Sequence, residues 1–393
     1  GIDLKIAIII DNKIGSGGGF DQALNSIIQF KKLCNNNHEI VVITLVKENV
    51  GILEDLGIAS IFFKVSLRDK LLSQFCSNQI FLLIQKFLKY FGPLEKKLLS
   101  INVDLAYFVT PSSLGLAFQV LNFITTIWDI CHRDHPEFPE VRNFGEFFRR
   151  EYIYKNLLSY SSLVICDSKK TADNMSFQYG IDSRKLLPMP FSPSPLLTLE
   201  KKTQFSSVLK KYHIFGEYYY YPAQFWPHKN HIRILEALSY LKEKKITNMK
   251  VVFSGRDYGN LALVRDAIRR FGLESQVVII GFVNSDEVRA LYHGAKGVLF
   301  PSYFGPTNLP PLEAWSESVP LVYPRDFAAY TGAAAEYIDP DDASSLAGAI
   351  LKLRDKRRSN MLIRRGKERI EQLRIEREES ERLLLKWIER YSN

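Results

Sequence analysis

Short apolar runs that alternate with amphipathic stretches are the feature that most restricts how this chain can fold. Runs without polar interruption are typical of strands that are buried on both faces of a parallel sheet. In the first half of the chain we expect such strands at 5–10, 40–46, 104–109, 125–129 and 163–166. Helical spacing of apolar residues is found between them, around 24–33, 80–99 and 144–158. This alternation predicts a parallel α/β sheet with helices on both faces.

The pattern breaks near the middle of the chain and then repeats. Pro188, Pro190, Pro193 and Pro195 follow one another closely, and proline continues neither a helix nor a central strand. Beyond this expected linker, further strands are predicted at 218–221, 250–253, 277–280, 298–300 and 321–323. Because 393 residues exceed what one hydrophobic core usually organises, two domains are expected.

The expected domain boundaries follow from that break. We predict an N-terminal Rossmann-like domain over 1–190 and a C-terminal Rossmann-like domain over 191–370. Residues 371–393 mix apolar and charged side chains at helical spacing, which is typical of one or two amphipathic helices. Packing of this segment back on the N-terminal domain and a solvated position on a domain surface both fit the pattern.

Composition restricts the partners. The formal net charge of +9 favours nucleic acid, acidic membrane surfaces or phosphorylated small molecules. We expect no nucleic acid, because the chain has no zinc finger, no RRM-type aromatic motif and no long basic arm. No apolar run reaches the roughly 18 residues that suggest a membrane span. The four cysteines form no Cys-x-x-Cys pair and no signal-peptide pattern precedes the first strand, so a cytoplasmic location is expected.

One segment resembles a known family. PSYFGPTNLPPLEAWSESVPLV (301–322) is similar to the signature of retaining glycosyltransferases of family 4, also called glycosyl transferases group 1. In that signature a strand ends in Pro-Ser, and a glycine-rich loop leads into a helix that carries Leu-Glu-Ala. The flanking pieces YYPAQFWPHKNH, GFVNSDEVRALYHGAKGVLF and YIDPDDASSLAGAI agree in order and spacing. The N-terminal half resembles the family more weakly, through its opening glycine loop, WDICHRDHPEFPE and VICDS.

The resemblance implies the GT-B architecture, with two Rossmann-like doubly wound domains and an interdomain cleft. The C-terminal domain would hold most of a nucleotide-diphosphate sugar, and the N-terminal domain would lie on the acceptor side. No further cofactor is implied. The expected acceptor is a glycan or a lipid-linked acceptor used in surface polysaccharide synthesis.

Lys229 is the main candidate for binding the donor diphosphate. It follows the strand at 218–221, where a side chain at the carboxyl end of a parallel sheet can reach a ligand. Its charge would neutralise the phosphates and stabilise the leaving nucleoside diphosphate. An exposed loop lysine is the alternative. The family commonly has an arginine where this chain has Gln224, so Arg256 and backbone amides are expected to assist, and Val283 is added to the donor site by the resemblance.

The loop before the Leu-Glu-Ala helix is expected to bind phosphate. Pro310 and Pro311 suit the first helical turn and would place the N–H groups of 307–309 at a positive helix end. Glycine allows close approach of the backbone, and Thr and Asn add hydrogen bonds. A purely structural turn is the alternative. The donor-binding residues expected here are Gly305, Thr307, Asn308 and Leu309.

Glu313 corresponds to the family glutamate that accepts hydrogen bonds from ribose hydroxyls. Its usual partner, eight residues upstream, would be at Gly305, so the paired-glutamate motif is incomplete. Without two positioned carboxyl groups, a glycosidase-like double displacement is not expected. The resemblance implies a retaining, front-face reaction in which the leaving phosphate helps to accept the acceptor proton.

Two features of the N-terminal half are candidates for the same site. The loop GSGGGF could bind a dinucleotide, but no acidic ribose ligand follows it, so we assign Gly17 and Gly18 to the donor or acceptor instead. The polar cluster at 128–140 follows a predicted strand and is a candidate for catalysis. We predict Asp129 and His132, together with Lys229, as the catalytic residues; a structural role for His132 fits nearly as well.

Metal binding is not expected. Asp339-Pro340-Asp341 imitates the Asp-x-Asp motif of metal-dependent transferases, but it stands where a helix should begin, and helix capping explains it better. A separate question is the stretch 79–99, which mixes large apolar residues with lysines. A helix at a membrane surface and a helix whose apolar stripe faces the core fit this pattern equally.

Three functions remain open from the sequence. The first is a metal-independent hexosyl- or deoxyhexosyltransferase at the inner face of the cytoplasmic membrane. The second is a catalytically weakened GT-B subunit that binds nucleotides or acts as a scaffold, suggested by Gln224 and Gly305. The third, an oxidoreductase that uses the first glycine loop, would require tight binding of NAD(P).

Overall fold

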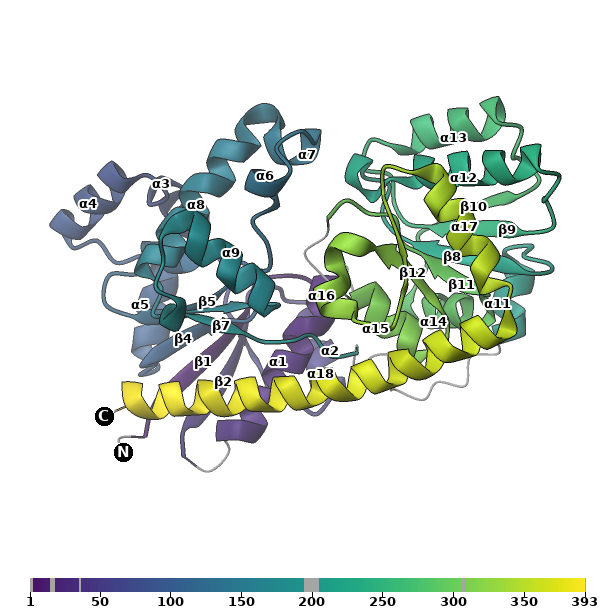
Figure 1. Cartoon of the computed structure of the whole chain (residues 1–393). Helices are drawn as coiled ribbons and strands as arrows, with labels where there is room; N and C mark the ends of the chain where they lie inside the picture. The colour runs from purple at the N-terminus through teal and green to yellow at the C-terminus, as the bar shows by residue number, and fades with distance from the viewer. Residues whose placement is uncertain (1–2, 15–17, 35–36, 194–204, 305–308, 393) are drawn as a thin grey trace. The chain divides into compact units, whose positions relative to one another are not determined.

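The computed structural model describes residues 3–14, 18–34, 37–193, 205–304 and 309–392. The chain divides into two compact units (Figure 1). Unit 1 contains Gly1–Pro136, Val141–Phe191 and Arg374–Asn393, and unit 2 contains Glu137–Glu140 and Ser192–Leu373.

Unit 1 is built on a parallel sheet with the strand order β3-β2-β1-β4-β5-β6-β7. The strands are β1 (Lys5–Ile10), β2 (Glu39–Thr44), β3 (Ile61–Phe62), β4 (Leu105–Phe108), β5 (Asn122–Thr126), β6 (Leu163–Cys166) and β7 (Leu186–Pro188). Alternate residues of the central strand β1 face opposite sides. Ile6, Ile8 and Ile10 join one core cluster, and Ala7 and Ile9 join the other. After the partly buried Lys5, the strand contains only apolar residues, because they are buried on both faces of the sheet.

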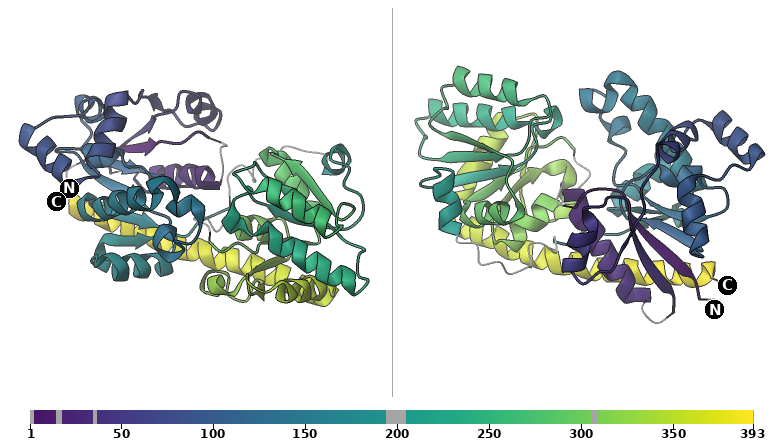
Figure 2. Two further views of the ribbon diagram at one scale, coloured as in Figure 1. Left: turned by 90° about the horizontal axis from the view of Figure 1, so that it is seen from above. Right: turned by 180° about the vertical axis from the view of Figure 1, so that it is seen from behind.

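Helices cover both faces of this sheet (Figure 2). On one face, α1 (Gly18–Cys34) packs through Leu24 and Phe30, and the final helix packs through Leu384 and Ile388. On the other face pack α5 (Pro93–Ser100), α8 (Glu146–Tyr160) and α9 (Lys169–Tyr179). The remaining helices of this unit are α2 (Asn49–Asp55), α3 (Leu67–Phe75), α4 (Gln79–Leu88) and α6 (Cys131–Asp134), and α7 (Pro139–Arg142) runs from unit 2 into unit 1.

Unit 2 repeats the architecture with the strand order β10-β9-β8-β11-β12-β13. Its strands are β8 (Tyr218–Pro222), β9 (Lys250–Ser254), β10 (Val277–Gly281), β11 (Gly297–Leu299), β12 (Leu321–Pro324) and β13 (Glu336–Ile338). Among its described residues, the α-helices before α18 are α11 (Phe205–Lys211), α12 (His231–Glu243), α13 (Leu261–Arg270), α14 (Ser285–Gly294), α15 (Leu309–Ser316), α16 (Ala328–Thr331) and α17 (Ala343–Leu353). The predicted fold class, two α/β units with parallel sheets, is confirmed.

In each sheet, the first three strands along the chain are added toward one edge, and the later strands are added toward the opposite edge. In unit 1 the reversal lies between β1 and β4, and in unit 2 it lies between β8 and β11. At such a switch point the loops after the two strands leave on opposite sides and open a crevice at their carboxyl ends. The topology therefore predicts a ligand-binding site at the loops that follow these strands.

Two helical predictions were inaccurate. The stretch 80–99 is two helices, α4 and α5, because the backbone turns left-handed at Lys89 and Pro93 then occupies the first turn of α5. The C-terminal segment is one helix, α18 (Lys356–Tyr391), which begins before the predicted residue 371. It starts in unit 2 and ends in unit 1. Within the described ranges, no helix is long and apolar enough to cross a bilayer.

Candidate active site

Lys229 lies at the switch point of unit 2. It ends the short 3-10 turn η4 (Pro227–Lys229), which follows β8, and its side chain is half-buried. The Lys229 ammonium nitrogen is 5.4 Å from the centre of the Phe300 ring, and Phe300 directly follows β11. The side chain therefore extends from the loop after β8 toward the loop after β11.

Buried and partly buried hydrogen bonds fix the backbone around Lys229. The Tyr221 hydroxyl donates to the Lys229 carbonyl oxygen over 2.6 Å. Asn230 has left-handed backbone geometry, with φ of 59°, and its side-chain amide donates to the carbonyl oxygens of Pro301 and Pro340, each at 3.0 Å. One amide thus ties the loops after β8, β11 and β13 together, and the turn that presents the lysine is held before any ligand arrives.

His228 is held by a buried carboxylate. Glu140 Oε1 accepts the His228 backbone N–H over 3.1 Å and also pairs with the ring Nδ1. The ring stacks on Phe304 with centroids 4.0 Å apart. Burial alone would raise the pKa of Glu140, but the hydrogen bonds to His228 outweigh it and hold that pKa below its usual value. His228, the residue before Lys229, is therefore held through both its backbone N–H and its imidazole ring.

Gln224, Arg256 and Val283 lie around the ends of β8, β9 and β10. The Gln224 side-chain oxygen accepts the backbone N–H of Arg256, so this side chain joins two neighbouring loops. The Arg256 guanidinium lies over the Phe282 ring at 4.2 Å. Val283, the next residue, is buried. The family commonly has an arginine at the position of Gln224. In this chain Gln224 has no charge of its own, and it positions the loop that carries Arg256.

Glu313 lies in α15 and is half-buried. The Tyr292 hydroxyl donates to Glu313 Oε2 over 2.7 Å. Burial first, and the Glu313 charge second, raise the pKa of Tyr292 well above its usual value, so the phenol stays protonated and remains a donor. Tyr292 is fully buried and therefore fixes one carboxylate oxygen.

Helix α15 begins at Leu309, directly after residues 305–308, which lie outside the described residues. Leu309 is buried, and Pro310 and Pro311 occupy the first turn, as the sequence predicted. Four of the predicted site residues lie outside the described residues, namely Gly17, Gly305, Thr307 and Asn308. Gly18 is the first residue of α1.

His132 lies inside unit 1 with no exposed surface. Its Nε2 pairs with Glu151 Oε2 at 2.8 Å, and Glu151 also accepts from the Tyr179 hydroxyl and the Arg133 guanidinium. Burial is the main cause that lowers the pKa of His132. Contact between this ring and a sugar would require neighbouring side chains to move, and its catalytic role stays a prediction.

Three aspartates follow strands of unit 1: Asp11 after β1, Asp129 beyond β5 and Asp167 after β6. Asp129 accepts the backbone N–H of Cys131 over 3.0 Å. Burial raises the pKa of Asp167 to about 7; hydrogen bonds from the next turn oppose this rise, and the Asp129 charge adds to it. A carboxyl group with a pKa near neutrality can exchange a proton under physiological conditions. The sequence reasoning missed Asp167, although it follows a predicted strand as Asp129 does.

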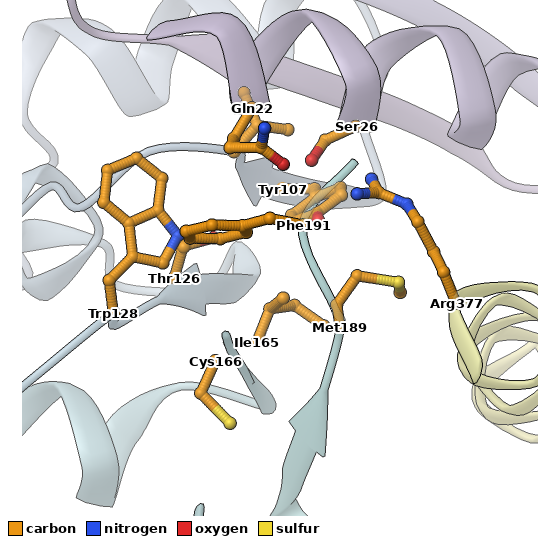
Figure 3. Close-up of a pocket in the computed structure, with 11 residues that line it drawn as sticks. Gln22, Ser26, Tyr107, Thr126, Trp128, Ile165, Cys166, Met189, Phe191 and Arg377 are labelled. Carbon is orange, nitrogen blue, oxygen red and sulfur yellow. The ribbon is translucent and has the colours of Figure 1, made fainter. Parts of the chain in front are cut away.

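A small cavity opens in unit 1 at the carboxyl ends of β4, β5, β6 and β7. Figure 3 shows Trp128 and Phe191 at one side and the Arg377 guanidinium at the other, with Gln22, Ser26, Tyr107, Thr126, Ile165, Cys166 and Met189 among the other lining residues. Its free volume is about 10 Å³, which is room for one water. Arg377 donates to the Pro190 carbonyl oxygen over 2.8 Å. In this conformation the cavity cannot hold a sugar.

The Asp339-Pro340-Asp341 sequence lies just before α17, and the contacts of this segment are with nearby side chains and with the helix start. Asp342, one residue beyond it, caps α17 by accepting the Ser344 N–H over 2.8 Å, so the predicted capping role belongs to this neighbour. Asp341 accepts from the Tyr303 hydroxyl over 2.6 Å. Across the described part of the chain, no three His, Cys, Asp or Glu side chains are grouped as metal ligands would be.

Comparison with solved structures identifies the class of fold. The chain is similar to HepE of Anabaena, solved in complex with UDP and glucose, with a TM-score of 0.71 and 16% identity over 96% of this chain and 99% of that chain. The two-unit architecture is therefore that of GT-B glycosyltransferases, as predicted.

Sequence comparison identifies the family. The family model "Glycosyl transferases group 1" matches residues 215–369, which lie within unit 2. The O-antigen chain mannosyltransferase RfbU of Salmonella typhimurium is 25% identical over 52% of this chain and 54% of its own length. The O-antigen chain mannosyltransferase B of Escherichia coli is 26% identical over 37% of this chain and 39% of its own length. The matches thus span about half or less of these two relatives.

Proposed function

We propose that the chain is a retaining, metal-independent glycosyltransferase that moves a hexosyl or deoxyhexosyl group from a nucleotide-diphosphate sugar to a glycan or lipid-linked acceptor of a surface polysaccharide. The observation that carries the proposal is Lys229 on a prearranged turn at the switch point of the family-matched unit. The names of the two curated relatives favour a mannosyl donor and an O-antigen product. The cytoplasm, at the inner face of the membrane, is the proposed location.

In the proposed reaction the bond from the anomeric carbon to the diphosphate oxygen breaks as the acceptor oxygen bonds to the same face of the sugar. The leaving diphosphate takes up the acceptor proton. Lys229 stabilises the charge on the leaving group, with Arg256 nearby in the next loop. Glu313 accepts hydrogen bonds from the ribose. Asp129 and His132 belong to the unit proposed to bind the acceptor.

A panel of nucleotide sugars tests the proposal directly. We expect binding of one donor and its slow hydrolysis without acceptor, both measurable from the released nucleoside diphosphate. Failure of every UDP, GDP and TDP sugar to bind or hydrolyse would contradict the proposal. The second candidate, a nucleotide-binding scaffold subunit, is favoured by the use of Gln224 for loop positioning; it predicts nucleotide binding without turnover on the native acceptor.

Glu313→Gln is expected to weaken ribonucleotide binding by about 1 kcal/mol, roughly fivefold, because a carboxylate is a stronger acceptor than an amide. The 2′-deoxy analogues should lose less, since they lack one of the two hydroxyl donors. Titration calorimetry with both nucleotides measures the contrast. Glu274→Gln, an exposed position in the same unit, is the matched control. Equal losses for the two nucleotides would place Glu313 outside the ribose site.

Donor turnover is expected to continue at its full rate in excess EDTA at constant ionic strength. The reason is that Lys229, Arg256 and the start of α15 are proposed to supply the positive charge that a divalent ion would otherwise provide. Release of nucleoside diphosphate with and without EDTA measures this. Loss of turnover that manganese or magnesium restores would overturn the metal-independent mechanism.

A further inference from the structure

Helix α4 exposes nearly all of its large apolar side chains. Figure 1 shows α3 and α4 at an outer edge of unit 1. The exposed residues of α4 are Ile80, Phe81, Leu83, Ile84, Phe87 and Leu88. Phe87 is 87% exposed, which is unusual for a phenylalanine in a folded domain.

The buried side of α4 consists of Leu82 and Gln85. The Gln85 amide donates to the Ala117 carbonyl oxygen over 2.7 Å, and its oxygen accepts from the Cys76 thiol over 3.1 Å. At about 100° per residue, five of the six exposed apolar residues lie in the half of the helix opposite to these anchors, and Phe81 lies just beyond its edge. The helix is thus attached through a partly polar seam and turns its apolar stripe outward, the reverse of a helix that covers a core.

Helix α3 extends the apolar surface. Leu67, Leu71 and Phe75 follow one another at intervals of four residues, and each is exposed. The Phe75 and Phe81 rings contact each other with centroids 5.2 Å apart. The two helices therefore present one continuous apolar surface, which we call the α3–α4 lobe.

The charges that this part of the chain shows to solvent are all positive. Every lysine and arginine between residues 64 and 97 is exposed. The acidic residues in that range, Asp69 and Glu95, are both buried. Asp69 accepts the Leu94 N–H over 2.9 Å, and Glu95 accepts backbone N–H groups of 119–121. An outward apolar stripe beside which residues 64–97 expose cations but no acidic side chain matches the boundary between the acyl chains and the headgroups of an anionic bilayer.

We propose that the α3–α4 lobe docks unit 1 on the anionic surface of a lipid bilayer. The apolar stripe of α4 enters the acyl boundary, and lysines such as Lys86 and Lys89 contact the headgroups. Docking lies in the plane of the surface, because ten residues of α4 are too short to span it. A second copy of the lobe fits this surface poorly, since the like charges would repel. The inference rests on the lobe alone and stands independently of the transferase activity.

The test is flotation of the full chain with vesicles of phosphatidylcholine alone or of equal parts phosphatidylcholine and phosphatidylglycerol. The wild type is expected to float with the anionic vesicles and to be released as salt is raised. The double change Ile84→Ser and Phe87→Ser should reduce binding at least tenfold with an unchanged melting temperature, because both side chains are already exposed. Lys86→Glu with Lys89→Glu should reduce binding to the anionic vesicles only.

Leu263→Ser with Ile375→Ser is the matched control, since both residues are 54% exposed and lie outside the lobe. It should bind like the wild type. The proposal is overturned if the wild type ignores anionic vesicles, binds neutral ones equally well, or binds unchanged after the Ile84 and Phe87 substitutions. It is equally overturned if those substitutions instead separate a dimer seen in solution without vesicles, because the lobe would then be a protein interface.

Discussion

Lys229→Ala is expected to weaken binding of a nucleoside diphosphate by about 1.5–3 kcal/mol, roughly 10- to 150-fold, and to leave binding of the free nucleoside nearly unchanged. The side chain stands on a turn fixed by Tyr221 and Asn230, so little ordering is needed when phosphate binds. Titration calorimetry with UDP, GDP and TDP, each beside its own nucleoside, measures the difference.

Two variants make this result specific. Lys229→Arg keeps the charge and should recover part of the lost affinity, although its planar fork differs from an ammonium. Lys244→Ala removes an exposed charge at the far end of α12, roughly 20 Å from Lys229 by the rise of the helix, and should change nothing. If Lys229→Ala weakened the nucleoside and the diphosphate equally, the lysine would have no phosphate role.

The buried strands could be predicted because strands covered on both faces need apolar side chains at every position. For this reason the predictions at 5–10 and 163–166 coincide with β1 and β6. The strands β3 and β7 were not predicted, since each has only two or three residues at an end of the sheet. Their existence depends on the neighbouring strand, and local sequence carries no sign of it.

The residues of the candidate site were easier to predict than the contacts that hold them. Lys229 and Glu313 were found because a short motif surrounds each of them. Glu140, which holds His228 in the turn that carries Lys229, is 88 residues away from His228 in sequence. Tyr292, which donates a hydrogen bond to Glu313, is 21 residues away from it. No periodic pattern links such partners, so only the fold reveals them.

The orientation of α4 shows a second limit of sequence reasoning. Periodicity indicates which residues share a helix face, but it does not indicate which face turns inward. Both orientations fitted the stretch 79–99 equally. The choice is made by long-range contacts of Gln85, whose amide reaches the Ala117 carbonyl oxygen across 32 residues of sequence.

Glu140→Ala is expected to lower the stability of the turn that carries Lys229 by about 2–4 kcal/mol, because it leaves the buried His228 N–H and ring without their acceptor. Hydrogen exchange of the backbone amide of His228 measures this locally, and exchange should accelerate by roughly 30-fold or more. Nucleoside diphosphate affinity should fall as well, since the lysine would lose its fixed position. Unchanged exchange in this variant would show that the pair does not hold the turn.

Glu140→Gln and a change of pH distinguish the contribution of the Glu140 charge to the stability of the turn from the contribution of its shape. The amide oxygen of glutamine can still accept the His228 N–H, so exchange should accelerate only slightly at pH 7. The pKa of Glu140 is lowered from 4.5 in the folded state, so its charge stabilises the turn above pH 4.5, and this contribution disappears as the pH falls through the lowered pKa. The wild type should therefore approach the glutamine variant in acid and differ most from it near neutrality. A difference that stayed constant down through the acid range would mean that the Glu140 charge contributes nothing and that the carboxylate acts by shape alone.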